Sequence, residues 1–362
     1  MIKKLLYSKY KVLFVFILLL PWVIPTLSRP SIDYGIFTDT ARGWLSGQIH
    51  LYDGQTEFYF APYAILAFVP FTVIPQPFGQ FIFAIIVLAA LVWATWKLTG
   101  STPWWTLAIG LATVYTALLV FNGQWDSIVL AGLAMGWIAL ENSNPWLMGF
   151  SFIVLGTKPT NILLPALLLL FSMRNWSKLK LAQTTIIPLI FVIISGFIAG
   201  WNWPLTYISN YREHPNPPNY VVVTPWTQAL YLRSYWEYLD KVGTILLCVF
   251  CIVAIILLIR RLRFKLDRKT LSIALAINLV ASPHALLYCF IFLAPIHILI
   301  LNEHRRWGLL LYGAALIDLI FIWLGIGVFI FPLVTLLVIM IIELMPQPVH
   351  SISPAIERTV SM

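Results

Sequence analysis

Charged residues are unusually scarce in this sequence. Only 10% of its 362 residues are Asp, Glu, Lys or Arg, whereas a soluble domain carries about 25%. Long polar segments are also absent, and 60% of the residues are hydrophobic. These shortages exclude a disordered chain, a soluble enzyme and a nucleic-acid-binding protein, so nucleic acid is not an expected partner. They predict a single all-α, polytopic membrane domain over residues 1–362, with about ten to twelve transmembrane helices of about 20 residues each.

Cysteine is scarce as well, with three residues in the chain. Cys248 and Cys251 form a C-x-x-C pair inside an apolar run, and Cys289 lies in another. A redox or zinc pair needs a polar, accessible site, so we interpret these cysteines as small apolar side chains of helices. The sequence also lacks the H-E-x-x-H, G-x-S-x-G and Walker patterns. Zinc, serine-hydrolase and nucleotide sites therefore have no motif support.

The basic residues between the apolar runs predict the orientation in the membrane, because Lys and Arg concentrate on the cytoplasmic side. Lys3 and Lys4 precede the first apolar run, 12–27, which we interpret as a retained span rather than a signal peptide. If the run 59–75 does not cross the membrane, 17 of the 23 Lys and Arg residues fall inside. The six that then lie outside are Arg29, Arg42, Lys158, Arg212, Arg233 and Lys241.

Proline and run length predict where the spans are irregular. The run 59–75 holds three prolines within 14 residues, which disfavours a regular span and predicts a Pro-broken hairpin or interfacial helix on the outer side. The runs 145–157 and 160–171 are too short to cross comfortably and are predicted to be tilted or to form a re-entrant pair. Asp318 is the acid that this topology places deep in a span.

Two outer segments stand out, 28–77 and the long loop 204–241, which is rich in Pro, Tyr and Trp. The first begins with helical spacing from Ile36 to Leu45 and a glycine stop at Gly47. One side of this predicted helix carries Ile36, Thr40, Gly43 and Trp44, and Asp39 and Arg42 lie on another. We expect an amphipathic helix at the outer membrane interface. Its expected interfacial anchors are Tyr52, Phe58, Tyr59 and Phe60.

Polar residues in unusual positions gather on the predicted outer side. An ionisable group at membrane depth costs several kcal/mol unless it is paired or hydrated, which makes it a functional candidate. The candidates are Asp33, Arg42, Gln124, Asp126, Lys158 and His284. Each also has a structural explanation: a helix cap for the acids and Gln124, a snorkelling side chain for the lysine, a buried hydrogen-bonded histidine and a surface arginine.

An acid, a lysine and a histidine facing one outer cleft make chemical sense together. The Asp33 carboxylate can act as a general base toward a hydroxyl. Lys158 and His284 can bind a phosphate and offset the charge on a departing phosphate oxygen. Asp33 and Asp39, six residues apart, do not by themselves define a divalent-cation site.

A series of short motifs occurs along the chain, over most of residues 30–300. The series comprises Asp33-Tyr34, Ala41-Arg42, Leu45-x-Gly47, Phe58-x-Phe60-x-Pro62, Asn122-Gly123-Gln124, Asn144-Pro145-Trp146, Thr157-Lys158-Pro159-Thr160 and Ser282-Pro283-His284. In order and spacing it resembles glycosyltransferase family 87, which belongs to the C-type, lipid-phosphate-sugar-dependent glycosyltransferases. The chain departs from the family at Phe60-Ala61-Pro62, where the usual motif is tyrosine-proline-proline.

The resemblance implies a GT-C-like bundle and an inverting hexosyltransferase of the plasma membrane. Its donor is a polyprenyl-phosphate sugar, usually mannose, and its acceptor is a hydroxyl of a lipid-linked glycan, a glycolipid or a cell-envelope glycan. The active site is implied to lie on the outer face, with the N-terminus in the cytoplasm, membrane lipids as partners, and no metal or other cofactor.

The resemblance also implies residue roles. The family's catalytic aspartate follows the first span and matches Asp33, which would be the general base toward the acceptor. The residues implied to bind the donor phosphate are Lys158, His284 and Arg42. The residues implied to contact the sugar or the acceptor are Tyr34, Gln124 and Asp126.

Two other classes compete with this interpretation. A secondary transporter or lipid flippase also has Pro-broken helices and rare buried charges, but it predicts matched broken segments in both halves of the chain. Thr157-Lys158-Pro159 and Ser282-Pro283-His284 lie in dissimilar surroundings. A non-catalytic subunit of an envelope complex would leave Asp33 replaceable. The polar groups confined to one face favour the glycosyltransferase.

Overall fold

The computed structural model describes residues 2–52, 58–100, 102–213, 239–262, 266–282, 285–324 and 329–345. This described part is helical and contains no β-strand, which confirms the predicted all-α class. Its α-helices are α1 (Ile2–Leu19), α2 (Ile32–Leu45), α3 (Gln76–Thr99), α4 (Trp104–Leu111), α5 (Val114–Asn122), α6 (Asp126–Glu141), α7 (Pro145–Gly156), α8 (Leu163–Ser172), α9 (Lys178–Ala199), α10 (Trp203–Glu213), α12 (Leu239–Leu262), α13 (Arg268–Ala281), α14 (Ala294–Glu303), α15 (Arg305–Trp323) and α16 (Phe331–Leu344). Short 3-10 helices are η1 (Leu20–Leu27), η2 (Pro62–Ala67), η3 (Val69–Val73), η4 (Pro159–Asn161), η5 (Met173–Asn175) and η6 (Leu287–Leu293).

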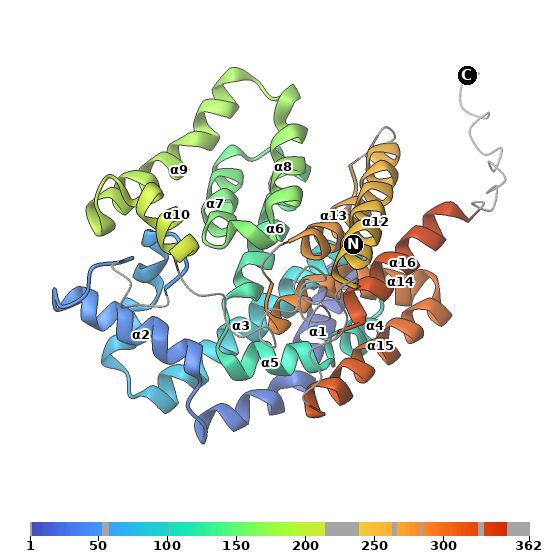
Figure 1. The fold of residues 1–362 in the computed structure, drawn as a ribbon, viewed down its shortest axis with the longest axis horizontal. Helices are drawn as coiled ribbons and strands as arrows, with labels where there is room; N and C mark the ends of the chain where they lie inside the picture. Colours follow the sequence, from blue (N-terminus) through green and yellow to red (C-terminus); the bar gives the residue numbers. More distant parts are fainter. Residues whose placement is uncertain are drawn as a thin grey trace.

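The chain is a polytopic membrane protein (Figure 1). In the described part of the chain, four helices are long and apolar enough to cross a membrane, and α4 with α5, bent by 65°, makes a fifth if the pair is one span. The four are Tyr10–Leu27, Gln76–Thr99, Lys178–Ala199 and Arg305–Trp323. Other apolar segments form shorter helices: Pro145–Gly156, Leu163–Asn175, Leu287–Glu303 and Phe331–Leu344.

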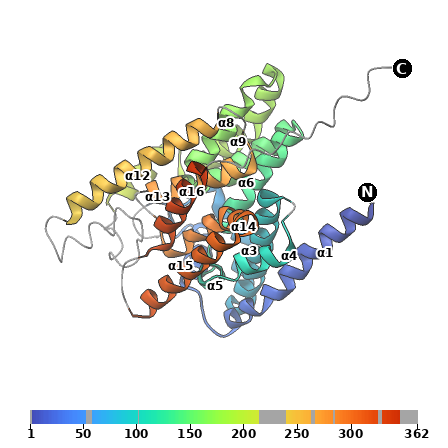
Figure 2. The ribbon, with the colours of Figure 1, turned by 90° about the vertical axis from the view of Figure 1, so that its right-hand side faces the viewer.

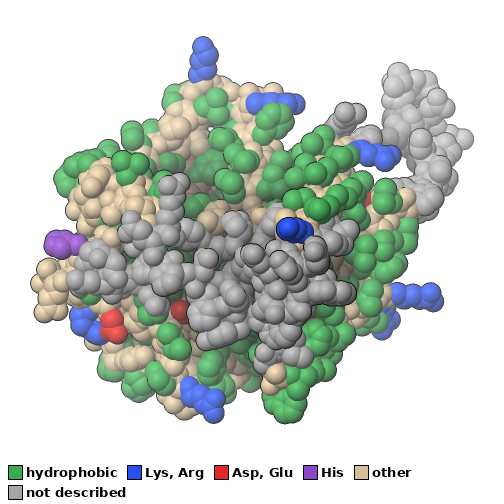
Figure 3. Space-filling view, viewed as in Figure 1, with side chains coloured by type: hydrophobic (Ala, Val, Ile, Leu, Met, Phe, Trp, Pro, Cys, Tyr) green, Lys and Arg blue, Asp and Glu red, His purple; other side chains and the backbone are tan. Residues whose placement is uncertain are grey.

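Large apolar side chains are exposed along several of these helices. Phe197 on α9 is 78% exposed and Trp323 at the end of α15 is 83% exposed. Hydrophobic side chains cover much of the described surface in Figure 3, with Lys and Arg mainly around its edge. In water this surface would cost free energy, and contact with lipid removes that cost. Figure 2 shows α1 on the outside of the bundle, where it packs on α3 and α4.

The bundle has two polar ends, connected by α3 and α6. At one end, Gln80 near the start of α3 hydrogen-bonds the backbone of Arg29 and Ser31. We call this the site end. At the other end, which we call the opposite end, Glu141 at the close of α6 pairs with Arg268 at 2.6 Å. The helix α3 has 24 residues and is therefore about 36 Å long, which separates the two ends by a membrane's thickness.

Ion pairs gather at the opposite end. Arg261 of α12 pairs with Glu343 at 2.8 Å and with Asp267 at 3.2 Å, and Lys269 of α13 pairs with Glu303 at 2.8 Å. Hydrogen bonds from Thr270 and the charge of Arg261 outweigh partial burial and lower the pKa of Asp267. This is the end that the basic residues of the sequence predict to be cytoplasmic.

The helix expected after the first span is present as α2, and the chain leaves it through Gly47 at φ +72°. Its predicted faces are confirmed: Thr40 is 3% exposed, while the side chains of Asp39 and Arg42 are 71% and 57% exposed. The prediction of interfacial aromatic anchors is wrong for Tyr52, Phe58 and Phe60. These three side chains are buried in the protein, where Phe58 and Phe60 pack edge-on against Phe37.

The Pro-rich run 59–75 forms two 3-10 helices, η2 and η3, rather than a span. Each begins next to a proline, which lacks a backbone N–H donor and cannot continue a regular helix. This confirms the predicted broken conformation. The two 3-10 helices pack against α2, and η2 also packs against α9.

Candidate active site

The first polar group of the site end is Asp33, in the first turn of α2. The α2 helix starts at Ser31, whose hydroxyl accepts the Tyr34 N–H at 3.3 Å, a normal N-terminal cap. The Ser31 N–H donates to Gln80 Oε1 at 2.9 Å. The start of α2 is therefore fastened to α3, which fixes the position of Asp33.

The loop between α5 and α6 brings Gln124 to Asp33. Gln124 is 2% exposed, and its side-chain amide donates to Asp33 Oδ2. The preceding Gly123 has φ +65°, and a Cβ there would meet the Cβ of Tyr34 at 2.8 Å. Glycine is required at this position both for the backbone conformation and for the close approach of α2. The Asn122-Gly123-Gln124 motif therefore lets the loop approach α2 closely and brings Gln124 to Asp33.

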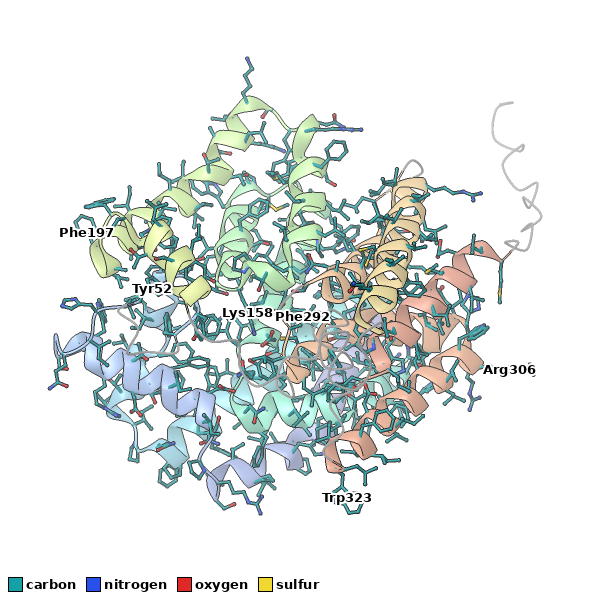
Figure 4. The ribbon with its side chains drawn as sticks, in the orientation of Figure 1. Tyr52, Lys158, Phe197, Phe292, Arg306 and Trp323 are labelled. Atoms are coloured by element: carbon teal, nitrogen blue, oxygen red, sulfur yellow. The ribbon has the colours of Figure 1, made fainter. Side chains whose placement is uncertain are left out.

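The second polar group is a buried ion pair. Lys158 Nζ lies 2.9 Å and 3.0 Å from the two carboxylate oxygens of Asp126. The Asp126 side chain is 0% exposed and the Lys158 side chain 16% exposed. Asp126 is the first residue of α6, and Trp125 occupies the N-cap position without a side-chain cap bond, so the helix-cap explanation for Asp126 is wrong. Figure 4 shows Lys158 pointing into the middle of the molecule.

Lys158 lies in a break between two short helices, α7 and α8. Four hydrogen bonds fasten this break to the rest of the protein. The Trp125 indole donates to Thr157 Oγ1 at 3.0 Å, the Ala61 N–H donates to the Thr157 carbonyl at 3.4 Å, and Asn278 of α13 accepts from the Leu164 N–H at 2.9 Å. Asn278 also donates to the Thr160 carbonyl at 3.1 Å. Irregular backbone in a membrane protein needs such internal partners.

Two residues of η6 complete the surroundings of Lys158. The Tyr288 ring lies under the ammonium, 4.9 Å from Nζ to the ring centroid, and Cys289 Sγ is 3.8 Å from Nζ. Asn161 donates to the same sulfur at 3.2 Å, and its own Oδ1 is buried with no partner in the part of the chain that the structure describes. Tyr288 also lies close enough to Asp33 and Gln124 to interact with them electrostatically. Tyr288 therefore lies near the Asp33 group and contacts the Lys158 group.

The remaining predicted residues are placed differently. Tyr34 is 1% exposed and packs against Phe71 and Phe83, and its hydroxyl has no hydrogen-bond partner among the described residues. Burial raises the pKa of Tyr34 to about 12, despite the opposing charge of Arg42. Arg42 donates to Asp39 at 2.7 Å and follows Asp33 by nine residues, which is about 2.5 helical turns and the other side of α2.

His284 lies outside the described residues, as does most of the loop 204–241. The structure therefore brings together four of the predicted residues, Asp33, Gln124, Asp126 and Lys158. In the described ranges, no group of three or more His, Cys, Asp or Glu residues is placed to hold a metal ion.

Five further residues belong to the site and were not predicted from the sequence: Trp125, Asn161, Asn278, Tyr288 and Cys289. Asn161 lies within three residues of Lys158, and Tyr288 follows the Ser282-Pro283-His284 motif by four residues. This closeness to a motif is the sequence feature that could have indicated Asn161 and Tyr288 as members of the site. Nothing in the sequence marks Asn278, since its role depends on α13 packing beside the break.

The family profile described as glycosyltransferase family 87 matches residues 58–288. The chain belongs to glycosyltransferase family 87. It is accordingly a membrane glycosyltransferase. The range that the family 87 profile matches contains Gln124, Asp126, Lys158 and Tyr288, whereas Asp33 precedes it. No curated protein and no solved structure matches the chain.

Proposed function

We propose that this family 87 enzyme transfers a hexose, mannose, from a polyprenyl phosphate to a hydroxyl of a lipid-linked or cell-envelope glycan. The transfer takes place at the outer face of the plasma membrane, at the site end of the bundle. The observation that carries the proposal is the side-by-side placement of two polar groups of opposite character. Asp33 is oriented by Gln124, and the partly exposed Lys158 pairs with the buried Asp126.

The proposed reaction is a single displacement with inversion. The Asp33 carboxylate takes the proton of the acceptor hydroxyl while that oxygen bonds to the anomeric carbon. The bond between the anomeric carbon and the phosphate oxygen breaks, and its electron pair leaves with the polyprenyl phosphate. Lys158 and His284 offset the charge on that phosphate. No metal or other cofactor enters the proposal.

The assignment of Gln124 to the sugar or acceptor follows from its contact with Asp33. A group that donates to the proposed base lies next to the hydroxyl that this base would deprotonate. The donor tail would lie against the apolar helices in the lipid. Arg42 is exposed and engaged with Asp39, and its phosphate contact, like the sugar contact of Tyr34, stays a prediction from the resemblance.

The proposal is tested by transfer from radiolabelled polyprenyl-phosphate mannose to a lipid extract in membranes that contain the protein. Asp33→Asn keeps the size and polarity of the side chain but removes the base, so turnover should fall about 10²-fold or more. Asp39→Asn is the matched control, because Asp39 lies on the same helix and is 71% exposed. Its turnover should equal that of the unmodified protein.

Near-normal transfer by Asp33→Asn would end the assignment of the base. If the unmodified protein gives no labelled product, a panel of other lipid-phosphate sugars follows. Failure of the whole panel would refute the reaction.

The outer-face location has its own test, cysteine labelling of intact cells with a membrane-impermeant maleimide. Ser28 is exposed at the site end, beside Arg29. Asn175 is exposed near the opposite end, where the adjoining Met173 and Trp176 pack with Ala139. Ser28→Cys should react in intact cells and Asn175→Cys only after permeabilisation. The reverse pattern would overturn the proposed orientation.

A further inference from the structure

The Lys158 ammonium is enclosed by groups from several elements. Those that titrate or carry charge and face it are Asp126 from α6, Tyr288 and Cys289 from η6, Asp33 from α2 and Tyr207 from α10. Among the described residues, only Asp126 contacts the ammonium with a carboxylate, and it does so with both oxygens. The state of Lys158 therefore depends first on Asp126.

Asp126 has no surface left for a substrate. Its side chain is 0% exposed, and both oxygens are taken by Lys158. The carboxylate also lies in the first turn of α6, where the helix dipole stabilises a negative charge. A carboxylate held in this way contributes a fixed charge rather than a substrate contact.

We propose that Asp126 is a positioning residue, which keeps Lys158 protonated and holds its ammonium where the donor phosphate binds. This inference rests on the proposed function, because it takes Lys158 as the phosphate ligand. It gives Asp126 a role different from the sugar or acceptor contact that the resemblance implies. Asp126 acts only through Lys158.

The role predicts a specific pH dependence. A buried lysine without a nearby carboxylate is shifted toward its neutral form. In Asp126→Asn, Lys158 should therefore lose its proton as the pH rises, and the donor KM should rise by about tenfold for each pH unit above that titration. In the unmodified enzyme the carboxylate favours the ammonium, so the donor KM should stay level over the same range.

The deciding experiment measures donor KM and kcat from pH 6 to pH 9 in four proteins: unmodified, Asp126→Asn, Lys158→Arg and the double variant. An arginine stays charged throughout this range. The double variant should therefore have a donor KM that is level with pH, even though it lacks the carboxylate. The expected result is a donor KM that rises with pH in Asp126→Asn and stays constant with pH in the double variant.

If the donor KM of Asp126→Asn is higher than that of the unmodified protein but constant with pH, Asp126 has a merely structural role and the inference is overturned. If Asp126→Asn does not fold, Asp126→Glu replaces it. That variant moves the carboxylate by one methylene and should raise the donor KM while leaving the acceptor KM unchanged. An unchanged donor KM would also overturn the inference. Absence of transfer by the unmodified protein would instead refute the proposed function.

Discussion

Asp126 and Asp318 are both fully buried carboxylates in helices of the same bundle, yet their partners differ. Asp126 pairs with the ammonium of Lys158 in a broken helix. Asp318 accepts hydrogen bonds from the Tyr115 hydroxyl at 2.6 Å, the Ile330 N–H at 2.8 Å and the Phe331 N–H at 3.1 Å. Asp126 therefore faces a positively charged group, and Asp318 faces neutral hydrogen-bond donors.

The donors to Asp318 explain its burial. The Ile330 and Phe331 N–H groups lie at the start of α16, where backbone donors have no partner within the helix. Asp318 of α15 satisfies them, and with Tyr115 it ties α16 and α5 to α15. An acid deep in a membrane protein is a functional candidate by default, but here the partners indicate a structural role. The partner of a buried carboxylate, more than its depth in the membrane, therefore distinguishes a functional acid from a structural one.

The largest effect in this comparison is expected from separating the buried pair. Lys158→Met leaves the Asp126 carboxylate buried without a cation, which should lower the free energy of unfolding by about 3–5 kcal/mol. Adding Asp126→Asn removes that charge, so the double variant should regain most of the stability. Transfer should stay lost in both variants. The measurement is unfolding in detergent micelles, alongside the transfer assay.

If Lys158→Met unfolds like the unmodified protein, the pair is not buried in the way the structure describes. If the double variant regains transfer together with stability, Lys158 has no part in binding the donor.

A smaller effect is expected at Asp318. In Asp318→Asn one oxygen acceptor is lost, which leaves a buried donor unsatisfied and should lower the free energy of unfolding by about 1–3 kcal/mol. Donor KM and kcat should change by less than about twofold, because the described partners of Asp318 are structural groups. Loss of transfer with unchanged stability would show that Asp318 has a role in the reaction rather than in the fold.

The smallest effect is expected at Tyr288. The interaction of its ring with the Lys158 ammonium is worth about 0.5–1 kcal/mol, so Tyr288→Leu should raise the donor KM about two- to fivefold. Tyr288→Phe keeps the ring and should leave the donor KM unchanged, which makes it the matched control. Equal donor KM values in the two variants would show that the ring does not support Lys158.

Much of the fold could be predicted because its causes are local. Composition predicts a membrane protein, helical spacing and a glycine stop predict α2, and three prolines predict the broken run 59–75. The aromatic anchors were predicted wrongly for Tyr52, Phe58 and Phe60. An aromatic side chain beside a membrane interface and one in the protein core look alike in sequence, and only packing distinguishes them.

Four members of the site were predictable from the sequence, but their pairings were not. The motifs carry Asp33, Gln124, Asp126 and Lys158, because each stands near a helix end or interrupts an apolar run. Nothing in the motifs states that Lys158 meets Asp126, 32 residues away, or Cys289, 131 residues away. The Tyr288 ring under the ammonium could not be predicted for the same reason.

Composition and short-range spacing act locally along the chain, so they are enough to predict that it is helical, lies in a membrane and carries rare charges at helix ends. Which buried aspartate pairs with the lysine, and which one accepts the N–H groups at the start of a helix, depends on tertiary packing. Asp126 begins α6 and Asp318 lies inside α15, but neither position in the sequence states which partner the carboxylate meets. Their partners arrive from distant segments, and the packing of those segments selects an ammonium for one carboxylate and backbone N–H groups for the other.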